Sequence, residues 1–338
     1  MDVTGNSFTV AVVQQPPVFL NKDESLKKAQ TLIDEAADRG VQVITFPETW
    51  LPGYPVWLDS SPRAALWGYA PAKALYRLLV ENSLRIPEDI CTLQEQAQKT
   101  ETYIIFGAHE LSGGTLYNTM VFIDKSGKFC IHRKVMPTYT ERLVWGRGDG
   151  STLKVMPTEY GNIGGLICWE HWMPLARAAM HAQRESVHIA QWPSVRELHQ
   201  IASRHYAFEG QCFVIAAGCY LTKKDVIEGF NTLNSEDKQA FELLEAIPGG
   251  ETTILLNGGS AVIKPTTGYV EGPVFDKSCI IYADIHLDLI REGHLFLDTD
   301  GHYSRPDIFH LEVNDESLTN VTFKSRRKNE GKGENHNY

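Results

Sequence analysis

The chain alternates between short runs of apolar, often β-branched residues and longer stretches in which apolar residues recur every three or four positions. The short runs predict buried or half-buried strands, and the longer stretches predict helices with one apolar face. The predicted strands are Phe8–Val13, Val41–Phe46, Tyr103–Gly107, Thr119–Ile123, Lys128–Arg133, Gly165–Cys168, Val187–Gln191, Cys212–Ala217, Ser260–Ile263 and Cys279–Ala283. The predicted helices are Asp23–Ala37, Ala72–Leu84, Pro87–Lys99, Pro174–Arg184 and Val195–Glu209.

The order of these elements predicts an α/β protein with a mixed sheet. Helices separate some of the strands, as parallel pairing requires. Other strands follow each other directly: Leu116–Asp124 and Lys128–Lys134 are joined by Lys125-Ser126-Gly127, which predicts an antiparallel hairpin. A mixed sheet with helices outside it is therefore favoured over a purely parallel one.

Three segments interrupt the alternation. Thr49–Pro71 is rich in Trp, Pro and Gly, and Leu221–Gly250 is polar and partly helical in its pattern. Residues 314–338 end in Gly, Asn, Glu and Lys, and we expect this C-terminal tail to be mobile.

Composition and charge narrow the class of protein. Of the 338 residues, 43% are hydrophobic and 22% are charged, which is typical of a globular chain. A net charge of −10 disfavours nucleic acid or an anionic membrane as a partner. No apolar run approaches the roughly 20 residues that span a bilayer, and the first residues lack a signal-peptide pattern. Six cysteines without a CxxC pair favour free thiols, so we expect a cytoplasmic protein.

Three predicted strands are followed by side chains of complementary chemistry, namely Glu48, Lys134 and Cys168. In open α/β sheets ligands bind outside the carboxyl ends of strands, so the three residues could share one pocket. A thiol, with a reference pKa of ~8.5, must lose its proton to attack. A Glu can take that proton if burial raises its own pKa from ~4.3, and a Lys favours the thiolate and donates to charge on a substrate.

Each of these residues also has a plainer interpretation. A Cys that closes an apolar strand is usually a small buried hydrophobe. Glu48 suits a turn or a helix cap, and Lys134 suits a solvated strand end. The spacing of the three positions does not by itself decide between the two interpretations.

The segments around the three residues resemble the nitrilases, the nitrile-hydrolysing branch of the carbon–nitrogen hydrolases. The matching blocks are Phe46–Glu48, Arg133–Gly150 and Cys168–Leu175, with later blocks at Gly258–Ser260 and Gly301–Asp307. The resemblance runs from about Phe8 to about Leu311. It implies a four-layer α-β-β-α sandwich, in which residues 1–313 form one domain with insertions near 49–71 and 221–250.

The resemblance also assigns roles to residues. Glu48 matches the general base, Lys134 the catalytic lysine and Cys168 the nucleophile, while Glu141 matches a second glutamate that positions the substrate or the attacking water. The implied reaction converts a nitrile and water into a carboxylic acid and ammonia through a thioimidate and a thioester on Cys168. The lysine and the backbone N–H of Trp169 are expected to meet the charge on nitrogen. No metal and no organic cofactor is implied.

Several residues near the motifs could form the wall of a substrate pocket. They are Tyr54, Thr138, Tyr139, Trp169, Trp172 and Trp192. Aromatic walls suit apolar or aryl groups, which favours aliphatic and arylaliphatic nitriles over hydrogen cyanide. The alternative is that these side chains are core or oligomer contacts, and for Tyr54 and Trp172 the two interpretations are equally supported.

Other functions remain open at this point. An amidase or an amide-forming, nitrile-hydrating enzyme would use the same fold and the same residues. A protein of another class, a non-catalytic assembly protein on a hydrolase fold, is disfavoured by the intact Glu48, Lys134 and Cys168. The twelve histidines include no HExxH motif, which disfavours a zinc site, and we interpret His171 as a support of the cysteine loop.

Self-association is a further implication of the resemblance. Nitrilase-like chains form dimers through helices close to the cysteine loop, here Pro174–Arg184 and Val195–Glu209. Nitrilases often extend dimers into spirals, which needs a second, non-closing contact. Thr49–Pro71 and Leu221–Gly250 are the candidates for that contact.

Overall fold

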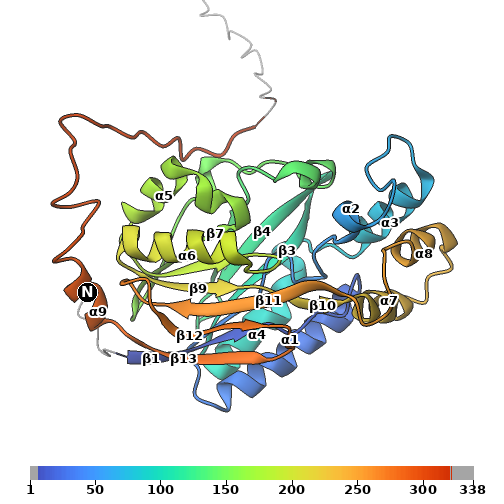
Figure 1. Ribbon diagram of the computed structural model, residues 1–338, viewed down its shortest axis with the longest axis horizontal. Helices are drawn as coiled ribbons and strands as arrows, with labels where there is room; N and C mark the ends of the chain where they lie inside the picture. The colour runs from blue at the N-terminus through green and yellow to red at the C-terminus, as the bar shows by residue number, and fades with distance from the viewer. Residues whose placement is uncertain (1–6, 320, 322–338) are drawn as a thin grey trace, which may run out of the picture.

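A computed structural model describes residues 7–319 and residue 321 (Figure 1). Its strands form two sheets. The six-stranded sheet has the order β13-β1-β2-β3-β4-β5, and the seven-stranded sheet has the order β10-β11-β9-β8-β7-β6, with β12 paired to β11. The strands of the first sheet are β1 (Ser7–Val13), β2 (Val43–Thr45), β3 (Tyr103–Ser112), β4 (Thr115–Ile123), β5 (Phe129–Arg133) and β13 (Ile280–His286). Those of the second are β6 (Met156–Thr158), β7 (Gly161–Ile167), β8 (Glu185–Gln191), β9 (Phe213–Ala217), β10 (Tyr220–Thr222), β11 (Ile254–Ile263) and β12 (Tyr269–Phe275).

Both sheets are mixed, as the sequence predicts. The central strands β1, β2 and β3 are parallel, as are β7, β8 and β9. The strands next to these two groups, namely β13, β4, β11 and β6, run antiparallel to them. Strands β4 and β5 form the predicted antiparallel hairpin. The α-helices are α1 (Lys22–Ala37), α2 (Trp57–Ser60), α3 (Ala70–Glu81), α4 (Cys91–Thr100), α5 (Pro174–His181), α6 (Glu197–Gly210), α7 (Lys223–Asn231), α8 (Lys238–Glu245) and α9 (Asp288–Gly293).

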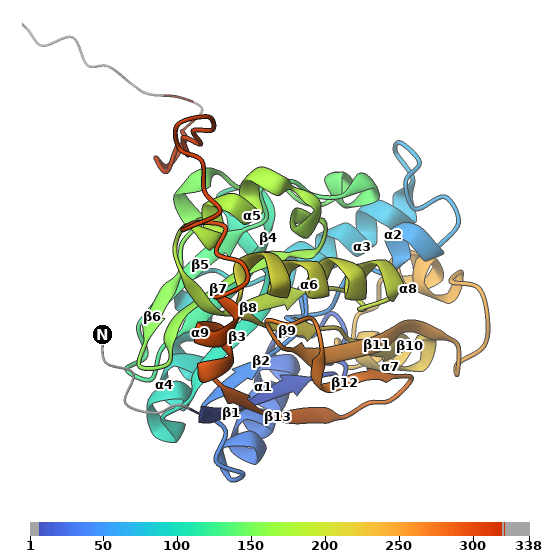
Figure 2. The same cartoon turned by 60° about the vertical axis from the view of Figure 1, so that its left-hand side comes forward.

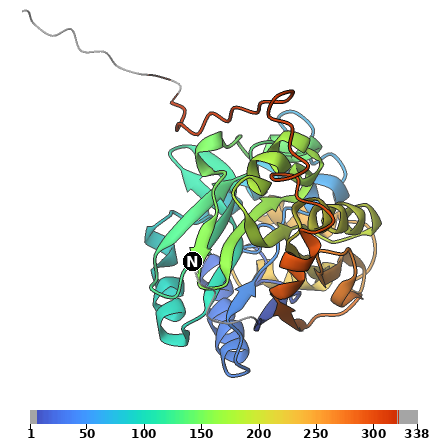
Figure 3. The same cartoon turned by 90° about the vertical axis from the view of Figure 1, so that its left-hand side faces the viewer.

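The alternation of side chains along β1 explains the layered arrangement. Val10 and Val12 belong to the core that joins the two sheets, whereas Ala11 and Val13 belong to the core beneath α1 and α4. On the far side, Met180 of α5 packs against the second sheet. Helices α1 and α4 therefore cover one outer face and α5 and α6 the other, which confirms the α-β-β-α sandwich (Figures 1 and 3).

Each of the ten predicted strands and five predicted helices is present, with ends that differ by a few residues. The pattern missed β6, β10, β12 and the short helices α2 and α9. Strand β6 has three residues and contains Pro157, and β12 contains Gly272-Pro273 and is half-exposed, so neither shows an apolar alternation. Helix α1 begins where its pattern predicts because the Asn21 side chain accepts a hydrogen bond from the Glu24 N–H at 3.1 Å.

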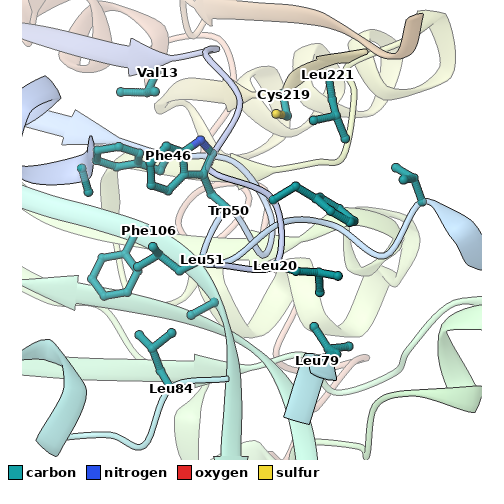
Figure 4. Packing of buried hydrophobic residues seen from close by; sticks show 14 of the residues in the cluster. Val13, Leu20, Phe46, Trp50, Leu51, Leu79, Leu84, Phe106, Cys219 and Leu221 are labelled. Atoms are coloured by element: carbon teal, nitrogen blue, oxygen red, sulfur yellow. The ribbon is translucent and has the colours of Figure 1, made fainter. Parts of the chain in front are cut away.

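The segments 49–71 and 221–250 pack together at one end of the sandwich. The core there includes Trp50, Leu51 and Leu221 (Figure 4). The Ser61 hydroxyl donates to the Leu243 carbonyl at 2.8 Å, which links the two segments directly. Helices α7 and α8 account for the partly helical character of the second segment.

The C-terminal segment leaves α9 and passes α5 (Figure 2). The Leu318 N–H donates to the Asp149 side chain at 2.9 Å, which holds this part of the segment against the Gly146–Gly150 loop. Of the predicted tail, residues 320 and 322–338 lie outside the described residues. Within residues 7–319, no helix has the length and apolar character that a membrane crossing needs.

Candidate active site

Glu48, Lys134 and Cys168 lie at strand ends that meet between the two sheets. Glu48 follows β2 and Lys134 follows β5 in the first sheet, while Cys168 follows β7 in the second. All three side chains are buried. A carboxylate oxygen of Glu48, one of Glu141 and the Cys168 sulfur lie within 4.8 Å of one another. The structure thus brings the four residues of the predicted catalytic group into one cluster.

Lys134 occupies the centre of this cluster. Its Nζ donates to Glu48 Oε1 at 2.8 Å and to Glu141 Oε2 at 2.7 Å. Burial alone would lower the pKa of Lys134, but the charges of Glu48, Cys168 and Glu141 outweigh it and raise that pKa. Lys134 is therefore a permanent cation between two carboxylates.

The two oxygens of Glu48 have different surroundings. Oε1 accepts hydrogen bonds from Lys134 and from the Asn118 side-chain amide, the latter at 2.7 Å. Oε2 is buried and has no hydrogen-bond partner. Burial, with a contribution from the negative charge of Glu141, raises the pKa of Glu48 to about 7 against the opposing effect of Lys134. Glu48 therefore offers a free oxygen and a near-neutral pKa, the two properties that a general base needs.

Cys168 rests as a thiol. Burial raises its pKa well above the ordinary value, and the negative charge of Glu48 adds to this effect, whereas Lys134 and the backbone N–H of Trp169 oppose it. The sulfur therefore needs a base to become a nucleophile. Cys168 also has a left-handed backbone, with φ of 54°, which ends the strand abruptly at the site.

Close backbone approaches set the position of Glu48. A side chain at Gly107 of β3 would collide with the Pro47 carbonyl and the Thr49 N–H, the two groups that flank Glu48. Asn118 of β4 links the partners, because its carbonyl accepts from the Lys134 N–H at 2.8 Å while its side chain donates to Glu48. The neighbouring strands β3 and β4 thus fix the distance between base and lysine.

Glu141 is held by three donors. It lies in the short 3-10 helix Tyr139–Leu143, where the Thr138 N–H donates to its Oε2 at 2.6 Å. The hydroxyl of Tyr54 donates to its Oε1 at 3.0 Å. With Lys134 as the third donor, the carboxylate has a fixed orientation next to Cys168.

A cavity of about 220 Å³ opens next to the cluster. It is lined by Tyr54, Asp59, Thr138, Tyr139, Thr140, Glu141, Cys168, Trp169, Pro193, Ser194, Arg196, His199 and Leu256. Four of the six residues expected in a pocket wall are in this set. Trp172 and Trp192 are not: Trp172 is exposed beyond the cysteine loop, and Trp192 is fully buried between the rings of His171 and His199.

Sequence reasoning missed Asn118, Asp59, Arg196 and His199. Asn118 carried a signal, because it is an amide inside a mostly buried strand and so needed a polar partner. Arg196 and His199 follow the carboxyl end of β8, where the strand-end rule that selected Cys168 also applies. Asp59 lies in the segment 49–71, whose conformation no periodic pattern predicts.

Among the residues described, Glu48, Glu141 and Cys168 are also close enough together, and of suitable types, to be considered as ligands of a metal ion. Lys134 Nζ already contacts both carboxylates, so the ammonium holds the place that a cation would take between them. The donor set therefore suits acid–base and nucleophilic chemistry better than metal coordination.

Comparison with known proteins agrees with this geometry. Residues 9–294 match the carbon–nitrogen hydrolase family. A nitrilase of Bradyrhizobium diazoefficiens is 36% identical over 92% of this chain and 93% of its own. A bifunctional nitrilase/nitrile hydratase of Nicotiana tabacum is 33% identical over 96% and 92%. The fold is similar to that of a carbon–nitrogen hydrolase from Helicobacter pylori, with a TM-score of 0.63 and 18% identity over 89% and 96%. This chain therefore belongs to the carbon–nitrogen hydrolase family, in its nitrilase branch.

Proposed function

We propose that the protein is a nitrilase that converts an organic nitrile and two waters into a carboxylic acid and ammonia, with Cys168 as nucleophile. The observation that carries this proposal is the unpartnered Oε2 of Glu48, buried on a carboxylate that lies within 4.8 Å of the Cys168 sulfur. A pKa of about 7 lets this carboxylate take the thiol proton near neutral pH.

The first half of the reaction forms a covalent thioimidate. Glu48 accepts the proton of Cys168 as the sulfur adds to the nitrile carbon, and the π electrons of the C≡N bond move to nitrogen. Lys134 and the backbone N–H of Trp169 stabilise the negative charge there, and the nitrogen then takes the proton that Glu48 received from the thiol. Glu141, held by Tyr54 and Thr138, keeps the lysine in place.

The second half releases both products. A water activated by Glu48 or Glu141 adds to the thioimidate carbon, and the protonated nitrogen leaves as ammonia, which gives a thioester. A second water then adds to the thioester carbon and expels the thiol, which releases the acid. If the sulfur leaves instead of ammonia after the first addition, the product is an amide. The Nicotiana relative, described as bifunctional, makes this second outcome a specific alternative.

The cavity supports a small substrate. Its volume of about 220 Å³ is below the roughly 300–1,000 Å³ of sites for drug-sized ligands. Tyr54, Tyr139 and Trp169 supply aromatic surface, so we propose a short aliphatic or arylaliphatic nitrile. A panel of such nitriles, together with cyanide and the matching amides, would test both class and reaction through separate measurement of acid, amide and ammonia.

The decisive comparison in that assay is Cys168→Ala against the unchanged chain. We expect ammonia release from every nitrile to be abolished in the variant. Undiminished release would overturn the assignment of the nucleophile. Faster turnover of amides than of nitriles would identify the protein as an amidase instead.

We also propose that the chain forms dimers through α5 and α6. Helices α5 and α6 lie on an outer face of the sandwich (Figure 2). These helices and the loop before α5 expose large apolar side chains. They are Trp172, Met173, Leu175, Leu198, Ile201 and Phe208. Exposed apolar surface of this kind favours burial against a second copy. A monomer in analytical ultracentrifugation would contradict this proposal.

A second contact would extend dimers into spirals. Of the two candidate segments, 49–71 exposes Leu66 and the whole of Trp67, and it is the better supported.

We also propose that residues 1–313 form a single domain, in which 49–71 and 221–250 are insertions. All six cysteines lie in the described residues and are free thiols, which supports a reducing compartment such as the cytoplasm.

A further inference from the structure

Behind the Cys168 loop, four buried polar side chains form one continuous series of hydrogen bonds. Nδ1 of His171 lies 2.7 Å from the Cys168 carbonyl oxygen, and its Nε2 lies 3.0 Å from Nε2 of His188. Nδ1 of His188 lies 2.8 Å from Glu185 Oε1, and the Tyr206 hydroxyl donates to Glu185 Oε2 at 2.5 Å. Each of the four residues is at most 5% exposed.

The positions of the protons follow from the partners. A carbonyl oxygen only accepts, so His171 carries its proton on Nδ1 and presents the lone pair of Nε2. His188 must then donate from its own Nε2, which leaves its Nδ1 as an acceptor. Burial lowers the pKa of both imidazoles well below the ordinary value, so both are neutral. The remaining donor is Glu185, whose pKa burial raises to about 7.

This series ends on one particular peptide group. The carbonyl that His171 contacts belongs to the Cys168–Trp169 peptide, whose other polar group is the Trp169 N–H. In a planar trans peptide these two groups point in opposite directions. The N–H also lies in the first turn of the short helix Cys168–Trp172, where backbone donors lack helical partners. Fixing the carbonyl therefore also fixes the direction of the N–H next to the sulfur.

We propose that His171 is a positioning residue of the reaction: supported by His188, Glu185 and Tyr206, it holds the Cys168 carbonyl so that the Trp169 N–H faces the charge that develops on the substrate nitrogen. This inference rests on the proposed role of Cys168. The hydrogen bond to the carbonyl also polarises the peptide, which makes its N–H a stronger donor.

Two substitutions at His171 separate this role from packing. His171→Phe retains a ring that can stack on Trp192, as His171 does at 4.7 Å between ring centroids, but it has no donor. His171→Asn loses the ring but keeps an amide N–H near the position of Nδ1. We expect His171→Phe to lower kcat by roughly 10- to 100-fold, with little change in KM, and His171→Asn to retain clearly more activity. If packing were the role, Phe would be the better tolerated of the two.

Alkylation of Cys168 by iodoacetamide supplies a measurement in which the Trp169 N–H acts only through its contact with the sulfur. This reaction develops no charge on a substrate nitrogen, so we expect its rate in His171→Phe to stay within about threefold of the unchanged chain. A decrease in alkylation as large as the decrease in kcat would mean that the sulfur itself has moved, and would overturn the inference.

A matched pair at Glu185 tests the far end of the series. Glu185→Gln can still donate to His188 and accept from Tyr206, because a neutral carboxyl and an amide offer the same groups. Glu185→Met can do neither. We expect Glu185→Gln to keep kcat within about threefold and Glu185→Met to lose roughly tenfold. Equal losses in the two variants would contradict the proton positions.

These outcomes are distinct from a failure of the proposed function. An unchanged chain that releases no ammonia from any nitrile would overturn the nitrilase assignment. An active chain in which His171→Phe is at least as fast as His171→Asn would overturn only the role of His171. The melting temperature of each variant, measured in parallel, shows that the compared chains are folded.

Discussion

Two buried polar clusters meet at Cys168, one next to its sulfur and one at its carbonyl, and they are built in opposite ways. In the cluster of Glu48, Lys134 and Glu141, two carboxylates share one cation and one oxygen of Glu48 has no partner. In the series from His171 to Tyr206, each step has a donor and an acceptor, and no net charge is needed. A buried group that is fully bonded is rigid, whereas one with an unused lone pair can react. The comparison suggests that the first cluster does the chemistry and the second holds it in place.

Glu48→Gln is the substitution that tests the difference between the two clusters most directly. The amide oxygen can still accept from Lys134 and Asn118, but the side chain can no longer take a proton. We expect kcat to fall by roughly 10²- to 10⁴-fold, the range that general base catalysis contributes. Single-turnover measurement of ammonia and acid would record this loss, and an unchanged rate would remove Glu48 from the mechanism.

Replacing the shared cation should damage the fold as well as the reaction. Lys134→Met leaves Glu48 and Glu141 buried without a counter-charge, which costs roughly 3–5 kcal/mol of unfolding free energy. The Glu48 carboxyl, whose pKa burial already raises to about 7, is easier to bury when protonated, so the loss should be smaller at pH 6 than at pH 8. Urea unfolding at both values measures this, with Lys128→Met at an exposed position as the control that should change little.

The pH dependence of kcat/KM reports on the free oxygen of Glu48. Because the base works only when ionised, and its pKa is raised to about 7, activity should fall as the pH drops through about 7. The decrease should reach tenfold per pH unit below that point, since a single proton blocks the base. Circular dichroism over the same range separates this effect from acid unfolding. A decrease in kcat/KM centred near pH 4.5 instead would indicate that Glu48 is not shielded from solvent.

The smallest effect on kcat is expected at Tyr206, the last residue of the series that begins at His171. Tyr206→Phe removes one hydrogen bond and leaves Glu185 Oε2 without a donor, which costs roughly 1–3 kcal/mol of unfolding free energy. Since His171 keeps its contact with Cys168, kcat should change far less than in His171→Phe. Thermal unfolding and steady-state kinetics on the same preparation test both statements.

The sequence predicts the strands that carry this site, and its principal residues, better than the hydrogen bonds between those residues. The apolar runs placed the ten strands, and the strand-end rule pointed to Glu48, Lys134 and Cys168, because both depend on local patterns. The resemblance to the nitrilases added Glu141. The difference between the two oxygens of Glu48 could not be predicted, since it depends on which neighbouring strand presents Asn118.

The series behind the loop could not be predicted for a related reason. His171 and His188 are 17 residues apart and meet only because β7 and β8 pair in parallel at one register. A shift of one residue in that register would turn His188 to the other face of the sheet. Trp192 illustrates the same limit, because its place near the motifs suggested a pocket wall while its ring lies in the core.

The two-to-one ratio of carboxylates to ammonium in the reacting cluster has a consequence for turnover. A nitrile is neutral and enters without an electrostatic cost, whereas the acid formed from it ionises to a carboxylate. An anion next to Glu48 and Glu141 is repelled, because Lys134 is already paired with both and the cavity lining adds the carboxylate of Asp59 as well as the guanidinium of Arg196. The charge that prepares the sulfur for attack therefore also favours departure of the product, and an enzyme of this design should be inhibited only weakly by the acid it makes.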